Sequence, residues 1–84
     1  MGKPIYVIIF SDVERFKSLY GYYAENEDKM KLLIIQTLEA EDSEVRDIDI
    51  DLRTNEVFCE FRDNSKEEWE TLNLVFAILK PVKK

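Results

Sequence analysis

The chain has 84 residues, 18 of them acidic and 12 basic, which gives a formal net charge of −6. This length fits a single small domain over residues 1–84, and the acidic balance argues against direct binding of nucleic acid or of an anionic membrane surface. The chain has no histidine, so it lacks the usual base near neutral pH and the commonest transition-metal ligand, and its one cysteine allows no internal disulfide.

The first predicted element is a strand over residues 3–10, which is apolar on both of its faces. Its side chains alternate between a face with Ile5, Val7 and Ile9 and a face with Tyr6, Ile8 and Phe10. A strand of this kind is usually central in its sheet and covered on both sides. If helices cover only one side of the sheet, one of these two apolar sets remains exposed.

Two helices are expected to follow this strand. Ser11 and Glu14 have the spacing of a capping box, and aromatic or apolar side chains then recur at helical spacing as far as Tyr23. Asn26 is a suitable cap for the second helix, because its side chain accepts hydrogen bonds from the first turn. The inner stripe of the second helix consists of Met30, Leu33, Ile34, Thr37 and Leu38, and an acidic run over residues 39–42 marks its end.

An acidic hairpin is predicted next, over about residues 44–62. From Asp47 to Leu52 aspartate alternates with isoleucine or leucine, and residues 56–62 alternate in a similar way, which is the period of half-buried strands. Aspartate is a poor strand former, so its repetition suggests a role other than folding. A loop at Thr54 and Asn55 would pair Leu52 with Val57, Ile50 with Cys59, and Ile48 with Phe61.

The solvent-exposed face of this hairpin, called its wet face, is the candidate binding site. The same register sets Asp47 opposite Arg62, Asp49 opposite Glu60, and Asp51 opposite Phe58. Neighbouring strands are ~4.8 Å apart and same-face side chains on one strand are ~7 Å apart, so the carboxylates would form a compact acidic lattice. The candidate partner-binding residues are Asp47, Asp49, Asp51, Glu56, Phe58 and Glu60.

A third helix is predicted over residues 65–79, because Ser65 and Glu68 form a second capping box. Its stripe consists of Trp69, Leu72, Val75, Phe76 and Leu79. The helical period of this stripe disfavours the alternative, a fourth strand over residues 74–79. The sequence therefore predicts an α+β domain in the order β-α-α-β-β-α, with a three-stranded, mainly antiparallel sheet and helices on one face. This element order resembles a ferredoxin-like arrangement that lacks its last strand.

No catalytic motif is present in the sequence, and we expect neither enzymatic activity nor a cofactor. Glycine stands only at positions 2 and 21, so there is no glycine-rich phosphate loop. The Asp-x-Asp-x-Asp spacing does not match an EF-hand loop, because Leu52 stands where that loop requires glycine and Phe58 where it requires glutamate. We predict no dedicated metal site, and weak divalent-cation binding by the aspartates stays an open alternative.

Two functional hypotheses follow from these features. The first is a small acidic binding or inhibitor protein that presents the hairpin face to a basic surface of a partner protein, such as a nucleic-acid-binding protein, with nucleic-acid mimicry as the sharpest form. The second is a homodimeric assembly or regulatory module that uses its bare sheet face, with Tyr6, Ile8 and Phe10 as the dimer interface. A cytoplasmic location is expected, because the sequence shows no signal-peptide core, membrane span or disulfide pattern.

Overall fold

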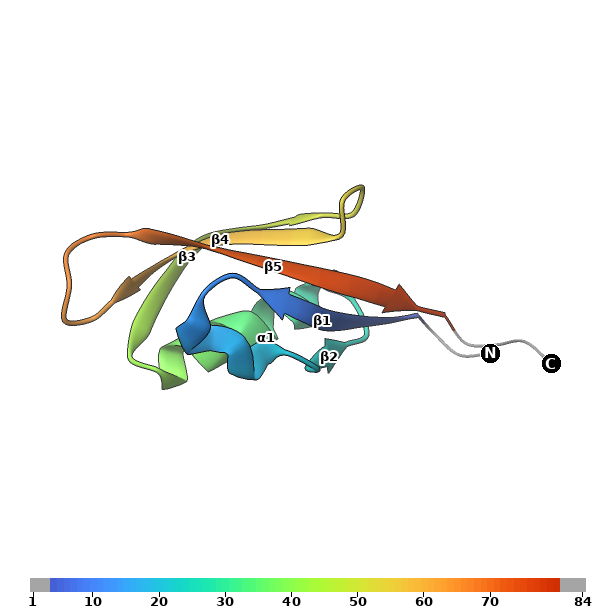
Figure 1. Ribbon diagram of the computed structural model, residues 1–84, viewed down its shortest axis with the longest axis horizontal. Helices are drawn as coiled ribbons and strands as arrows, with labels where there is room; N and C mark the ends of the chain where they lie inside the picture. The colour runs from blue at the N-terminus through green and yellow to red at the C-terminus, as the bar shows by residue number, and fades with distance from the viewer. Residues whose placement is uncertain (1–3, 81–84) are drawn as a thin grey trace.

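The computed structural model of the protein describes residues 4–80, which form a five-stranded sheet, one 3₁₀ helix and one α-helix. In chain order the elements are β1 (Ile5–Ser11), η1 (Glu14–Leu19), β2 (Tyr23–Ala24), α1 (Glu27–Ala40), β3 (Ser43–Asp51), β4 (Glu56–Asp63) and β5 (Glu70–Leu79). All neighbouring strands are antiparallel, in the spatial order β2-β1-β5-β4-β3. Figure 1 shows α1 lying along one side of the sheet, and no described helix covers the other side.

The predicted three-stranded sheet in the order β-α-α-β-β-α is therefore wrong. The segment predicted as the third helix contains β5, and the first predicted helix is reduced to η1, which β2 follows. Ser11 does not cap η1, because its hydroxyl donates to the Val13 carbonyl at 3.2 Å. The first strand, the second predicted helix and the existence of the β3–β4 hairpin are confirmed.

The segment that forms β5 carries two periodicities at once. Leu72, Val75 and Phe76 recur at helical spacing, but Leu72, Leu74 and Phe76 also recur at every second position. These last three are buried, whereas Asn73 and Val75 between them are only half-buried. Because β5 is the central strand and pairs with both β1 and β4, the sheet satisfies its backbone on both edges and selects the strand conformation.

The core lies between the sheet and the layer formed by α1 and η1. Asn26 caps α1 as predicted, since its Oδ1 accepts a hydrogen bond from the Lys29 N–H at 2.8 Å. Burial raises the pKa of the Cys59 thiol to about 12, so this cysteine serves as a small protonated core side chain. The core side chains are Ile8, Phe16, Leu19, Ala24, Met30, Ile34, Leu38, Val57, Cys59, Phe61, Leu72, Leu74 and Phe76.

Ser65, the predicted cap of the third helix, instead closes a turn with Asp63. Its backbone N–H and its hydroxyl both donate to Asp63 Oδ1, at 3.0 and 2.7 Å. Arg15 Nη1 lies 2.8 Å from the other carboxylate oxygen of Asp63, and Arg15 Nη2 donates to the Glu41 carbonyl. Arg15 thereby joins η1 to the end of α1 and to the end of β4.

We expect this cluster to make stability depend on pH in the acid range. Hydrogen bonds from Ser65, and to a smaller extent the Arg15 guanidinium, lower the pKa of Asp63 from its usual value of 3.8 to about 2. Because the folded-state pKa lies below the unfolded-state pKa, the stabilisation is present above the unfolded value and is lost as pH falls toward about 2. Urea titrations at about pH 5 and about pH 2.5 should show Asp63→Asn less stable than wild type, with a smaller difference at the lower pH. A difference that stays constant with pH would contradict this role of Asp63.

Candidate binding face

We call the side of the sheet opposite α1 the open face. A bulge in β1 determines which apolar side chains of this strand lie on the open face. The pairing of β1 with β5 shifts between Ile8 and Phe10, so Ile9 is an additional residue. Before the bulge, Ile8 is fully buried and Tyr6 stacks on a buried phenylalanine of β5, with ring centroids 5.5 Å apart. After the bulge, Phe10 pairs with Val75 and is 49% exposed. The structure therefore does not bring Tyr6, Ile8 and Phe10 together on one exposed face, as the predicted dimer interface requires.

The pairing of β1 with β5 assembles a continuous apolar surface on the open face. We call it the apolar strip, and it consists of three cross-strand pairs: Ile5 with Leu79, Val7 with Ala77, and Phe10 with Val75. Tyr23 of β2 pairs with Val7 and extends this surface toward the sheet edge. Leu79 is 56% and Tyr23 is 66% exposed. A contiguous exposed apolar surface on a small domain usually marks a contact site.

Carboxylates lie beside the apolar strip on the same face of the sheet. The β3–β4 register pairs Asp51 with Glu56 and Asp49 with Phe58, and the β4–β5 register sets Glu56 beside Val75. We call Asp49, Asp51 and Glu56 the acidic corner. Among residues 4–80 no lysine or arginine forms an ion pair with Asp49 or Glu56. The corner therefore presents negative charge directly next to apolar side chains.

Asp51 is the member of the acidic corner that contacts the hairpin loop through Arg53. Its Oδ1 accepts a hydrogen bond from the Arg53 N–H at 2.9 Å and lies 3.5 Å from Arg53 Nε. The backbone hydrogen bond is the main cause that lowers the pKa of Asp51 below its usual value. The Arg53 side chain is 90% exposed, so this ion pair holds it only weakly.

The register of the hairpin differs from the predicted one. The loop spans residues 52–55 rather than two residues, and a bulge places Asp47 and Ile48 together opposite Cys59. Asp47 and Asn55 adopt positive φ angles of 53° and 57°, which aspartate and asparagine tolerate better than most residues. These two local conformations shift the pairing in ways that side-chain alternation alone does not reveal.

All six predicted pairs of the hairpin are accordingly wrong. The apolar pairs were Leu52 with Val57, Ile50 with Cys59 and Ile48 with Phe61, and the wet-face pairs were Asp47 with Arg62, Asp49 with Glu60 and Asp51 with Phe58. In the structure Ile50 faces Val57, and Val45 faces Phe61. The predicted burial of this face holds for Ile48 and Ile50, which pack against the core, but is wrong for Leu52, which is 46% exposed.

Two arginines divide the predicted acidic lattice. Arg46 faces Glu60 and Arg62 faces Glu44, with ion pairs of 3.3 and 2.7 Å. The Arg46 and Arg62 guanidinium carbons also lie 3.9 and 5.2 Å from the ring centroid of Trp69. This end of the open face is thus internally neutralised, and the uniform lattice is reduced to the acidic corner.

The candidate partner-binding residues separate into three groups. Asp49, Asp51, Glu56 and the 39% exposed Phe58 lie together on the open face. Glu60 lies on the same face but is paired with an arginine. Asp47 is exposed and occupies the bulge.

Replacing Asp49 tests whether the acidic corner contributes to folding. In the structure Asp49 faces Phe58 rather than a second carboxylate, and threonine is the better strand former. We expect Asp49→Thr to leave the free energy of unfolding unchanged or to raise it by up to ~1 kcal/mol in a denaturant titration. A decrease of more than ~1 kcal/mol would show that Asp49 has a structural role.

Sequence reasoning missed the β5 half of the apolar strip, namely Val75, Ala77 and Leu79. It placed residues 65–79 in a helix, in which Val75 and Leu79 belong to the inner stripe but Ala77 does not share their face. The signal that identifies them is the second periodicity of the segment, because Val75, Ala77 and Leu79 are apolar side chains at every second position, in alternation with the buried Leu74 and Phe76. Trp69 was assigned to the same helical stripe, and its contact with two arginines was not predicted.

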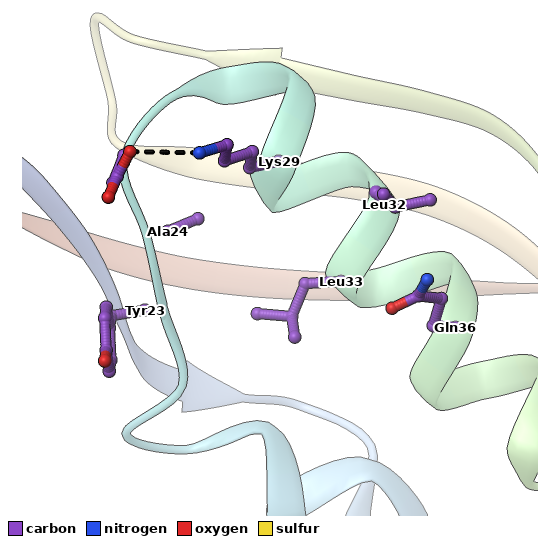
Figure 2. A pocket seen from close by; sticks show the side chains of 7 residues that line it. Tyr23, Ala24, Lys29, Leu32, Leu33 and Gln36 are labelled. Carbon is purple, nitrogen blue, oxygen red and sulfur yellow. Dashed lines mark hydrogen bonds and ion pairs between the residues drawn. The ribbon is translucent and has the colours of Figure 1, made fainter.

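A separate hollow of about 260 Å³ lies between β2 and α1 (Figure 2). Figure 2 shows Leu32 and Leu33 of α1 beside it, together with Lys29, whose Nζ lies 3.0 Å from Glu25 Oε2. Its lining residues are Tyr23, Ala24, Glu25, Lys29, Leu32, Leu33 and Gln36. This hollow is smaller than typical small-molecule pockets.

Searches against protein-family models, curated proteins and solved structures found no match to this chain. No helix within residues 4–80 combines the length and the apolar character that crossing a membrane requires. Within the same residues, no group of three or more carboxylate or thiol side chains is arranged to hold a metal ion. A functional proposal therefore rests on the open face.

Proposed function

We propose that this protein is a small non-enzymatic binding protein that docks its open face on a partner protein with a basic surface. The observation that carries the proposal is the direct contact between the apolar strip and the acidic corner, made where Val75 of β5 pairs with Glu56 of β4. The strip supplies contact area that leaves water on binding. The corner steers and selects a partner of positive charge. Phe58, which pairs with Asp49 of the acidic corner and with Asn73 of β5, supplies an aromatic anchor.

Nucleic-acid mimicry is a narrower form of this proposal, and the arrangement favours it less. A mimic of a phosphate backbone needs regularly spaced negative charge, since duplex DNA carries one charge per ~1.7 Å of its axis. On the open face, Arg46 and Arg62 pair with two of the carboxylates. The mixed apolar and acidic surface resembles a protein-protein contact more than a row of phosphates. The cytoplasmic location stays a prediction, supported by the single, buried cysteine.

Self-association is the second candidate function, and the apolar strip is the observation that favours it. Ten residues of β5 span ~33 Å and five strands span ~20 Å, but β2 has only two residues, so the open face measures at most ~650 Å². This area approaches the ~800 Å² per partner of a standard interface. Sedimentation at micromolar concentration decides between the candidates: self-association predicts a dimer, and a 10.0 kDa monomer excludes it.

The proposal is tested by capturing partners from a cell lysate with three forms of the chain. One is wild type, and the second carries Phe10→Asp and Leu79→Asp, two exposed positions of the apolar strip. The third carries Ser18→Asp and Leu32→Asp, which change the net charge equally at exposed positions of η1 and α1. We expect capture by wild type and by the η1/α1 variant, with loss of the same proteins from the strip variant and in high salt. Equal capture by all three forms would overturn the proposal.

A further inference from the structure

We propose that the segment of the partner that the open face receives is an amphipathic α-helix with basic residues along one flank. This inference rests on the proposed function and adds the shape and the charge pattern of what binds. It follows from the dimensions of the apolar strip, from the layering of the fold and from the position of the acidic corner.

The dimensions of the apolar strip match one short helix. From Ile5 to Phe10 the strip runs ~17 Å along the strands, which equals about three helical turns of 5.4 Å. Across the strands, β2 with Tyr23 and β4 with Glu56 flank the strip, and these two strands are three strand spacings or ~14 Å apart. A helix with its side chains is ~10–12 Å wide, so it fits across the strip between β2 and β4.

The layering of the fold leaves room for such a helix. The described helices α1 and η1 both contribute to the core on one side of the sheet, and Phe16 of η1 packs edge-on against Phe61 of β4 with ring centroids 5.0 Å apart. A sheet that is apolar on both faces is normally covered by helices on both. The strands β1 and β5 have this character, since Ile8 and Phe76 face the core while Val7 and Val75 face the open side. A bound helix would supply the third layer.

The position of the charges favours a basic helix over a second copy of this chain. The acidic corner lies at the Phe10–Val75 end of the apolar strip, on its β4 side, where one flank of a bound helix would contact it. The two arginines of the open face, Arg46 and Arg62, are already paired with Glu60 and Glu44. A second copy packed face to face therefore brings no unpaired arginine from β3 or β4 to neutralise the corner, whereas lysine or arginine on the flank of a helix does.

The probe for this inference is a capped peptide of about 16 residues, long enough to be helical, with leucine at helical spacing and lysine along one flank. In the first control peptide glutamate replaces each lysine. In the second control the same residues are shuffled so that the leucines no longer share a face. NMR titration of the labelled full chain measures the affinity of each peptide and identifies the residues that it contacts.

We expect the lysine peptide to shift the signals of Ile5, Val7 and Val75 and to bind at least about tenfold more tightly than the glutamate peptide at low salt. The Phe10→Asp and Leu79→Asp variant should weaken its binding at least about tenfold. Equal binding of the shuffled peptide would overturn the inference, because charge alone would then explain the affinity. Shifts confined to the hollow between β2 and α1 would also overturn it.

Failure of this inference is distinguishable from failure of the proposed function. If no peptide binds but lysate capture still depends on Phe10 and Leu79, the open face binds something other than a helix, and only the inference is overturned. If lysate capture does not depend on these residues, the proposed function itself fails. If wild type is a dimer and the Phe10→Asp and Leu79→Asp variant is a monomer, the open face binds a second copy of this chain. That result would overturn the inference of a bound helix.

Discussion

Phe76→Ala should lower the free energy of unfolding by about 3–5 kcal/mol, because it removes a large buried ring. Phe76 is 1% exposed and stacks on Tyr6, with an interplanar angle of 1°. The cavity left between β5, β1 and α1 can collapse only partly, since close-packed neighbours surround it. Urea or guanidinium titration of the full chain measures this loss.

Phe10→Ala provides the matched control for this prediction. Phe10 is also a phenylalanine of a paired strand, but the bulge in β1 turns it to the open face, where it is 49% exposed. Its truncation should change the free energy of unfolding by no more than about 0.5–1 kcal/mol. A loss as large as that of Phe76→Ala would show that Phe10 is buried within the chain, which would contradict the description of the open face.

Reversing the charge of the acidic corner should produce the largest change in binding. Replacing Asp49, Asp51 and Glu56 with lysine places three positive charges where the corner meets the basic flank of the partner. We expect association of the lysine peptide to slow by about 10–1,000-fold at low salt, since steering by complementary charge acts mainly on the association rate. At about 1 M salt the Debye length is ~3 Å, so most of this difference should disappear. Stopped-flow fluorescence over a range of salt concentrations measures both effects.

The control for this reversal changes the net charge by the same amount without touching the open face. Lysine replaces Asp28, Glu39 and Glu41, which are exposed residues of α1 and of its C-terminal cap. Association with the lysine peptide should slow much less than for the reversed corner. If the two triple variants slow association equally, net charge rather than the acidic corner is responsible, and a specific site on the open face is excluded.

The sequence predicts those parts of the fold that local chemistry determines. Asn26 marks the start of α1 because its side chain satisfies a free N–H of the first turn, and that hydrogen bond is present in the structure. Alternation in the hairpin predicts its two strands and the burial of Ile48, Ile50, Val57 and Cys59, because side chains of a strand point to opposite faces in turn.

The parts that the sequence does not predict depend on long-range pairing. Residues 70–79 are compatible with a helix or a strand, and the choice is made by pairing with β4, the preceding strand, and with β1, which lies far away in the sequence. The two bulges, at Ile9 and at Asp47, depend on single backbone conformations that do not alter the alternation pattern. Each bulge changes which side chains share a face.

The errors in strand assignment and register explain how the predicted binding site differs from the observed one. The prediction found the acidic side chains of the open face, because aspartate in a strand is conspicuous against local preference. It named Ile5 and Val7 as one of two apolar sets that could remain exposed, but it did not find the apolar strip as a whole, because half of that strip comes from β5 and the bulge in β1 adds Phe10. The acidic lattice also appeared more uniform than it is, since Arg46 was not placed opposite Glu60.

The most direct test of the open face as the binding surface is methyl NMR of the chain with and without a partner captured from the lysate. We predict that binding broadens or shifts the methyl signals of Ile5, Val7 and Val75 in the apolar strip, while those of Leu32 and Leu33 on α1 stay unchanged. The contrary result, with changes at Leu32 and Leu33 and none in the strip, would place the binding surface at the hollow between β2 and α1 and would contradict this account.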